Sequence, residues 1–127
     1  ITERLLEGAI SALDAIGQQP ALRTVIEVPG AFELPLGAQK LCQRNDIDGV
    51  LAIGVVIQGE TRHFDFICNA VANGLAHLSA THAAPFIFGV LTTDNMEQAK
   101  DRSGGKHGNK GVEAAVTAIK MTTAILD

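Results

Sequence analysis

The chain has 127 residues, the length of a single domain, and 46% of them are hydrophobic, with a mean hydropathy of +0.20. Its formal charge of −4 and pI near 5.5 exclude a nucleic-acid partner, because no basic stripe is available to neutralise phosphates. The longest apolar run, residues 50–57, is far below the roughly 20 residues that a membrane-spanning helix needs.

The apolar pattern predicts an initial helix, then three strand–helix units, then one further helix. Residues 2–16 have apolar side chains at helical spacing, and Gly17 ends the pattern. Residues 21–28 have the composition of a strand that ends at Pro29-Gly30. Residues 32–43 return to a helical period.

The second and third units have clearer signals. Residues 49–57 are continuously apolar, as expected of a strand buried on both faces. Residues 62–79 carry one apolar helical stripe, and residues 86–91 form the third predicted strand. Asp94, with Glu97 three residues later, predicts the capped start of a short helix that extends to about Arg102. A glycine-rich turn at 103–109 then leads to a last helix over 110–125.

Strands that alternate with helices predict a parallel sheet covered on both faces. We therefore expect a single α/β domain over residues 1–127, a three-layer sandwich with a flavodoxin-like parallel sheet. The chain opens on a helix without a preceding strand, and a sheet of three parallel strands would leave unpaired N–H and C=O groups along an edge. We therefore expect about twenty or more residues before Ile1 in the gene product, including a further strand that pairs into the sheet.

The two cysteines, Cys42 and Cys68, lie on apolar helical faces. Their spacing fits neither a Cys-x-x-Cys motif nor a zinc site, so we expect both to be reduced core residues. Reduced thiols indicate a cytoplasmic protein, and a plant plastid would also fit.

Polar or glycine-marked segments follow each predicted strand, and ligands of open parallel sheets bind beyond the carboxyl ends of the strands. These segments are Pro-Gly-Ala-Phe-Glu at 29–33, Gln-Gly-Glu-Thr-Arg-His at 58–63 and Thr-Thr-Asp at 92–94. Backbone N–H groups at a helix start favour an anion, and His63 is placed there for proton transfer. With the cations of residues 101–111, this pattern indicates an enzyme that handles a small phosphorylated substrate.

Taken alone, each feature also has a purely structural interpretation. Gly59-Glu60-Thr61 is compatible with a simple helix cap, and His63 with a surface or core histidine. Glu33 has the position of a capping carboxylate as well as that of a hydroxyl binder. Arg102 has the position of a solvated cation favoured by a helix dipole.

Three other kinds of site do not fit the sequence. His63 and Asp65 diverge on a helix, which argues against a metal site. Residues 104–111 lack the Gly-Lys-Ser/Thr ending of a phosphate-binding P-loop and follow a helix instead of a strand. No Gly-x-Ser-x-Gly nucleophile motif is present.

Four motifs, in this order, resemble the lumazine synthase family. They are Val-Pro-Gly-Ala-Phe-Glu-Leu-Pro at 28–35, Gly-x-Val-Ile-x-Gly-x-Thr-x-His-Phe-Asp at 54–65, Phe-Gly-Val-Leu-Thr at 88–92 and Asp-Arg-Ser-Gly-Gly-Lys-His-Gly-Asn-Lys-Gly at 101–111. The resemblance is collinear from the first helix to the last. It implies condensation of 5-amino-6-(D-ribitylamino)uracil with 3,4-dihydroxy-2-butanone 4-phosphate to 6,7-dimethyl-8-ribityllumazine, in riboflavin biosynthesis, with no cofactor and no metal.

The resemblance also implies a role for each matching residue. The segment that contacts the ribityl chain and the pyrimidine is matched by Ala31, Phe32 and Glu33. The strand end that lines the pyrimidine site with backbone groups is matched by Val55, Val56 and Ile57. The turn that receives the phosphate is matched by Glu60 and Thr61. Arg102 matches the cation that pairs with the phosphate, His63 the proton-transfer residue and Phe88 a pocket wall.

In the family, the equivalents of Phe88 and Arg102 come from the neighbouring subunit of a pentamer. The resemblance therefore implies a homopentamer with sites at its interfaces, and the uninterrupted turn at 104–109 resembles members that form sixty-subunit icosahedral capsids. The family begins with a strand whose end carries an aromatic residue that stacks on the pyrimidine, and this chain lacks that segment. Position 55 is Val where many members have Thr or another small residue, and little effect is expected because the contact there is mainly with backbone.

Two other functions compete with this interpretation. One is a non-catalytic flavodoxin-like module that binds a ribityl or flavin phosphate, and the other is a shell protein whose pocket is vestigial. The combination of His63 and Arg102 favours the enzyme over both.

Overall fold

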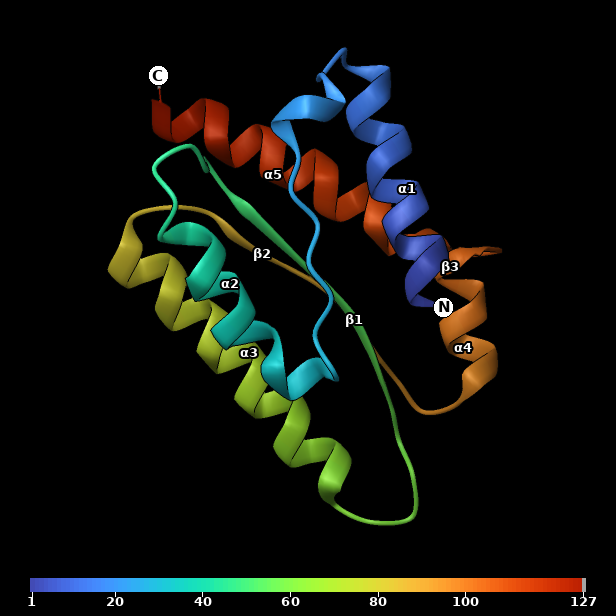
Figure 1. Cartoon of the computed structure of the whole chain (residues 1–127). Helices are drawn as coiled ribbons and strands as arrows, with labels where there is room; N and C mark the ends of the chain where they lie inside the picture. Colours follow the sequence, from blue (N-terminus) through green and yellow to red (C-terminus); the bar gives the residue numbers. More distant parts are fainter. Residues whose placement is uncertain (127) are drawn as a thin grey trace.

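Two parallel strands form the centre of the fold (Figure 1). In the computed structural model, which describes residues 1–126, β1 (Val50–Ile57) pairs with β2 (Phe86–Thr93) along its whole length, from Val50–Phe86 to Ile57–Thr93. Helix α3 (His63–His82) connects the two strands. The predicted strands at 49–57 and 86–91 and the helix between them are thus confirmed.

Helices cover both faces of these strands, because successive strand residues point to opposite faces. On one face, α2 (Leu34–Cys42) and α3 enclose a core with buried strand residues that include Ala52 and Val90. On the other face lie α1 (Thr2–Ala15), α4 (Met96–Asp101) and α5 (Lys110–Leu126), which contribute Leu5, Ala99 and Ala114 to two smaller clusters. Figure 1 shows these two helical layers with the strands between them, so the predicted three-layer α/β fold is confirmed.

The predicted strand at residues 21–28 is wrong. Pro20–Leu22 form a short 3-10 helix (η1), and residues 23–28 run on without pairing to any strand of the described chain. A cavity of about 390 Å³ lies between this segment and β1 and is also lined by α1 and α2. Strands must lie about 4.7–4.9 Å apart to share hydrogen bonds, so this gap keeps the two backbones from pairing.

The start of α4 is shifted by one residue from the predicted cap. Asn95 is the N-cap, and its Oδ1 accepts a hydrogen bond from the Gln98 backbone N–H at 2.9 Å. Gln98 Oε1 in turn accepts from the Asp94 N–H at 2.8 Å. The predicted pair of Asp94 and Glu97 is therefore wrong: Asn95 supplies the capping oxygen in place of Asp94, and asparagine is as good an N-cap as aspartate.

The glycine-rich turn at 103–109 is a short β-hairpin. β3 (Ser103–Gly105) pairs antiparallel with β4 (Gly108–Asn109). Gly104 and Gly108 have φ angles of 109° and 80°, a region that favours glycine because it has no Cβ. The hairpin connects Arg102, which follows α4, to the start of α5.

Both cysteines are free and half-buried. Burial, together with the nearby Asp65 carboxylate, raises the pKa of the Cys68 thiol. Among the helices of residues 1–126, none is long and apolar enough to cross a membrane.

Candidate active site

The carboxyl end of β1 leads directly into the segment with most of the predicted site residues. The Gln58 N–H donates to the Thr93 carbonyl at 2.8 Å, which extends the contact between the two strands by one residue. Residues 58–62 then form an exposed turn, and α3 begins at His63. The turn is thus held at the sheet edge where parallel α/β proteins bind ligands.

Thr61 and His63 are joined at the start of α3. Thr61 Oγ1 accepts a hydrogen bond from the His63 backbone N–H at 3.3 Å, while the N-cap residue, Arg62, makes no side-chain cap. The Thr61 hydroxyl therefore does act as a helix cap in this turn. It does not compete with anion binding, since the helix start still directs positive partial charge toward the turn. Both side chains are exposed, and so is Glu60.

The 3-10 helix η2 (Ala31–Glu33) lies beside the same edge, where it packs against α3 and β1. The Phe32 side chain is 59% exposed, although Ala31 beside it packs against the core. Ala31 of η2 and Ile67 of α3 pack against the same core, so η2 lies on the same face of β1 as α3. This face of the strands thus carries an exposed aromatic ring on η2 and an exposed histidine at the start of α3.

Glu33 occupies the N-cap position of α2, yet its side chain makes no capping hydrogen bond. The alternative that Glu33 is only a capping carboxylate therefore finds no support. Its half-buried carboxylate remains available to accept hydrogen bonds from ligand hydroxyl groups.

The strand end offers backbone groups instead of side chains. Val56 packs against the α2–α3 core, whereas Val55 and Ile57 pack on the opposite face with α1 and α4. Within residues 1–126, β1 pairs with β2 alone. Alternate N–H and C=O groups along its other edge are consequently free to bind a ligand.

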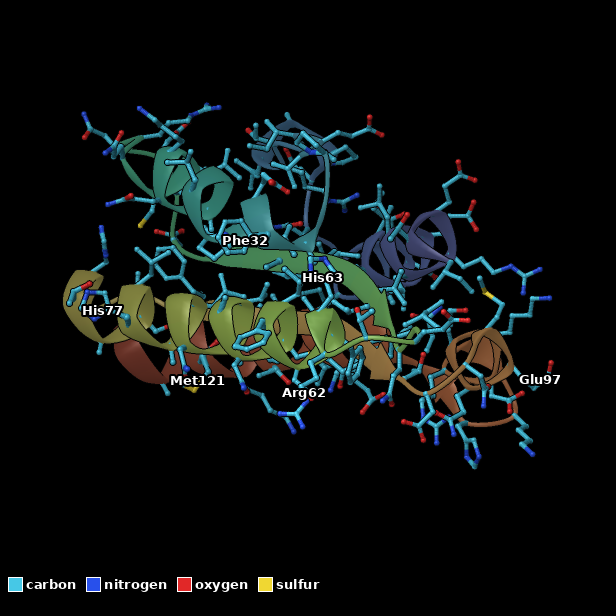
Figure 2. The ribbon with its side chains drawn as sticks, turned by 90° about the horizontal axis from the view of Figure 1, so that it is seen from below. Phe32, Arg62, His63, His77, Glu97 and Met121 are labelled. Atoms are coloured by element: carbon cyan, nitrogen blue, oxygen red, sulfur yellow. The ribbon has the colours of Figure 1, made fainter. Side chains whose placement is uncertain are left out.

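Arg102 lies apart from this cluster, and Phe88 lies in the middle of the sheet. Arg102 ends α4, which packs on the other face of the strands, and its Nη1 donates to the Gln98 carbonyl at 3.1 Å. Phe88 pairs with Ala52 in the middle of the sheet and is half-buried against the α2–α3 core. Figure 2 shows α4, marked by Glu97, well away from His63. One chain therefore brings together the η2, β1 and α3 residues and keeps the Arg102 cation elsewhere.

Asn109 is a structurally important residue that the sequence pattern alone does not reveal. It immediately precedes α5, and its Oδ1 accepts hydrogen bonds from the Gly111 and Val112 N–H groups at 2.8 and 3.2 Å. An asparagine just before a helical pattern is an N-cap signal that the glycines around it concealed. Across residues 1–126, no three His, Cys, Asp or Glu side chains gather closely enough to hold a metal ion.

The fold and this edge define the class of protein: an α/β protein with a small-molecule site at the carboxyl end of a parallel sheet. The model of the 6,7-dimethyl-8-ribityllumazine synthase family matches residues 1–125. The chain therefore belongs to the 6,7-dimethyl-8-ribityllumazine synthase family, transferases that form this lumazine in riboflavin biosynthesis. The resemblance found in the four motifs is confirmed.

Bacterial relatives agree with this membership. The 6,7-dimethyl-8-ribityllumazine synthase of Cytophaga hutchinsonii is 59% identical over 121 residues, which cover 95% of this chain and 76% of the relative. The enzymes of the same name from Parabacteroides distasonis and Thermus thermophilus are 51% and 50% identical over 121 residues. These alignments cover 95% of this chain and 76% and 77% of the two relatives.

Proposed function

We propose that this chain, as a single domain, condenses 5-amino-6-(D-ribitylamino)uracil with 3,4-dihydroxy-2-butanone 4-phosphate to 6,7-dimethyl-8-ribityllumazine, releasing phosphate and water. The observation that carries the proposal is the meeting of η2, the end of β1 and the start of α3 at one exposed edge. This edge offers an aromatic surface, free backbone groups, a helix start and a histidine, which are the groups that two such substrates need.

The uracil substrate binds between η2 and the end of β1. Phe32 lies against the pyrimidine, and the free backbone groups of Val55, Val56 and Ile57 pair with its polar edge. The Glu33 carboxylate, which makes no cap in α2, accepts hydrogen bonds from the ribityl hydroxyls.

The phosphate of the four-carbon substrate binds at the start of α3. The Thr61 hydroxyl, which accepts one hydrogen bond from His63, still has its own proton to donate to a phosphate oxygen. Glu60 contributes through its backbone, because its carboxylate would repel the anion. The helix dipole adds to the attraction for the leaving phosphate.

His63 moves the protons. The uracil amine attacks the ketone to form an imine with loss of water, phosphate leaves by elimination, and ring closure expels a second water. Each of these steps requires a proton to be taken up or released next to the bound substrates. The exposed His63 imidazole lies two residues after the hydroxyl that binds phosphate, and an imidazole can both accept and donate a proton.

Arg102 and Phe88 complete the site from a neighbouring subunit of a homopentamer. The position of Arg102 away from His63 within one chain supports this arrangement, because a cation that binds the same phosphate then has to come from another chain. Exposed large apolar side chains, which a subunit interface would cover, include Leu36, Phe66 and Val116. The pentamers assemble further into a sixty-subunit icosahedral capsid, a proposal supported by the short hairpin at 103–109.

Mixing the protein with both substrates and following the lumazine fluorescence tests this function directly. Product formation that depends on both substrates is expected. Binding of the uracil without turnover would instead identify a binding module. The absence of both binding and turnover would indicate a shell protein. Sedimentation velocity and negative-stain microscopy report the assembly independently of activity.

The free state of both cysteines supports a reducing compartment, and we place the enzyme in the cytoplasm.

A further inference from the structure

A single amide side chain connects three elements next to Arg102. Asn109 Nδ2 donates a hydrogen bond to the Arg4 carbonyl of α1 at 3.0 Å. Its Oδ1 caps α5 by accepting from the Gly111 and Val112 N–H groups. Because Asn109 itself ends β4, the same residue ties the hairpin to α1 and α5.

The surroundings of this amide leave it little freedom. A Cβ at Gly8 of α1 would overlap the Asn109 side chain, and a Cβ at Gly111 of α5 would overlap the Leu5 carbonyl. The two helices therefore approach each other at glycines, with the amide held between them. Close packing of this kind fixes the position of the hairpin instead of merely stabilising one helix.

The hairpin in turn fixes the backbone at Arg102. The Lys110 N–H, next to Asn109, donates to the Arg102 carbonyl at 2.9 Å, and the His107 N–H donates to the Asp101 carbonyl at 2.8 Å. Ser103 pairs with Asn109 across the hairpin and is only 1% exposed. The backbone on both sides of Arg102 is thus held by hydrogen bonds to the hairpin, whose last residue is Asn109.

We propose that Asn109 is a positioning residue for Arg102. By fixing the hairpin against α1 and α5, it sets the direction in which the Arg102 guanidinium leaves the end of α4, and through it the affinity for the phosphate-bearing substrate. This inference rests on the proposed role of Arg102 in binding the phosphate.

The variant Asn109→Asp separates the two bonds of this side chain. A carboxylate caps a helix as well as an amide does, and its charge suits the N-terminal end of the dipole, so α5 keeps its cap. A carboxylate cannot donate to the Arg4 carbonyl, so the connection to α1 is lost. The matched control is Asn95→Asp, the same change at the N-cap of α4, where the side chain accepts from Gln98.

Steady-state kinetics of the full chain with both substrates test the proposal. We expect Asn109→Asp to raise KM for the butanone phosphate about tenfold, equivalent to about 1.4 kcal/mol, and to leave KM for the uracil within about twofold. Asn95→Asp should leave both constants unchanged. A rise of both KM values together would overturn the proposal, because it would indicate a general structural defect, and so would unchanged constants.

A double-mutant cycle with Arg102→Ala shows whether Asn109 acts through Arg102. In the Arg102→Ala background, Asn109→Asp should have no further effect on KM for the butanone phosphate, whereas additive effects would contradict a positioning role. If Arg102→Ala alone leaves this KM unchanged, the proposed role of Arg102 fails instead. Asn109→Ser, which keeps a capping oxygen, is the second variant. Failure of both position-109 variants to fold would also overturn the inference, because Asn109 would then serve the fold itself.

Discussion

The backbone N–H of His63 donates to the hydroxyl of Thr61, at 3.3 Å from nitrogen to oxygen. This bond places a hydroxyl that can bind phosphate next to an imidazole that can transfer a proton, with a helix start beneath both. The arrangement needs no additional support from the core, because residues 58–63 are all exposed. Substitutions here should therefore change catalysis with little effect on folding.

Replacing His63 with alanine should lower kcat and leave the fold and both KM values nearly intact. General acid–base catalysis typically contributes about 10²–10⁴ in rate, and we expect the lower end or less. The reason is that an amine and a ketone already react readily once they are held together. The measurement is turnover by lumazine fluorescence, with circular dichroism to verify the fold.

His77→Ala is the matched control for His63→Ala. His77 is also an exposed histidine of α3, and Figure 2 shows it near the opposite end of that helix. Its loss should leave kcat unchanged. Full turnover in His63→Ala would remove this residue from the mechanism, although the remaining pocket would still stand.

Replacing Arg102 with alanine should weaken use of the butanone phosphate far more than binding of the uracil. A hydrogen bond to a charged group contributes about 1.5–3 kcal/mol, which corresponds to roughly a ten- to hundredfold rise in KM for the phosphate substrate. Steady-state kinetics with each substrate varied in turn provide the measurement. Lys106→Ala is the control, because Lys106 is a neighbouring exposed cation whose ammonium lies 3.8 Å from the Asp101 carboxylate. Equal effects of the two variants would show that only the local charge matters.

The thiol of Cys68 should react slowly with alkylating reagents. Burial and the Asp65 carboxylate raise the pKa of Cys68, so at a given pH less of the reactive thiolate is present. Asp65→Asn should lower this pKa and speed the reaction, whereas the half-buried position keeps the rate below that of a free thiol. Rates of iodoacetamide labelling across pH 7–10 in a Cys42→Ser background would measure the change. A rate that does not respond to Asp65→Asn would show that burial alone raises the pKa.

The sequence predicts most of the fold, because buried faces of helices and strands produce regular patterns of apolar residues. β1 appears as a continuous apolar run because helices cover both of its faces. α3 appears as a single apolar stripe because only one side of the helix is buried. Residues 21–28 carry the composition of a strand, but composition reports the preference of a segment and cannot report whether a neighbour lies within hydrogen-bond distance. The cap at Asn95 was missed because Asp94 and Asn95 have nearly equal preferences for that position.

Only part of the arrangement of the candidate site follows from the sequence. The residues from 58 to 63 are contiguous, so their proximity follows from the turn itself. Glu33 gains support as a ligand group because the structure shows no cap on its carboxylate, which the sequence leaves open. Asn109 was missed because its importance lies in a bond to Arg4, on a helix far away in the sequence.

The cavity between residues 23–28 and β1 has a lining and an open strand edge that an added strand could use. The cavity is lined mainly by apolar residues of α1, α2 and β1, and the β1 edge beside it has free backbone groups. An extended apolar peptide should pair with residues 50–53 of β1, the part of the strand that lines the cavity, and leave the backbone groups of residues 55–57 free for the pyrimidine. An aromatic residue at its carboxyl end should then bring a ring toward Phe32 and Ile57. Strand addition of this kind gains affinity from main-chain hydrogen bonds and specificity from side-chain pockets.

The peptide should raise the midpoint of thermal unfolding in a concentration-dependent manner, because it binds the folded state, and it should tighten binding of the ribitylaminouracil. The chain without it should bind this substrate weakly and assemble poorly. Calorimetric titration with the uracil, with and without peptide, is the measurement. The control peptide carries proline at alternate positions, which removes the backbone donors and keeps the peptide apolar. Equal stabilisation by both peptides would mean that the cavity binds apolar chains without forming a strand. A chain that binds the uracil tightly and forms stable pentamers without either peptide would show that the site needs no further strand.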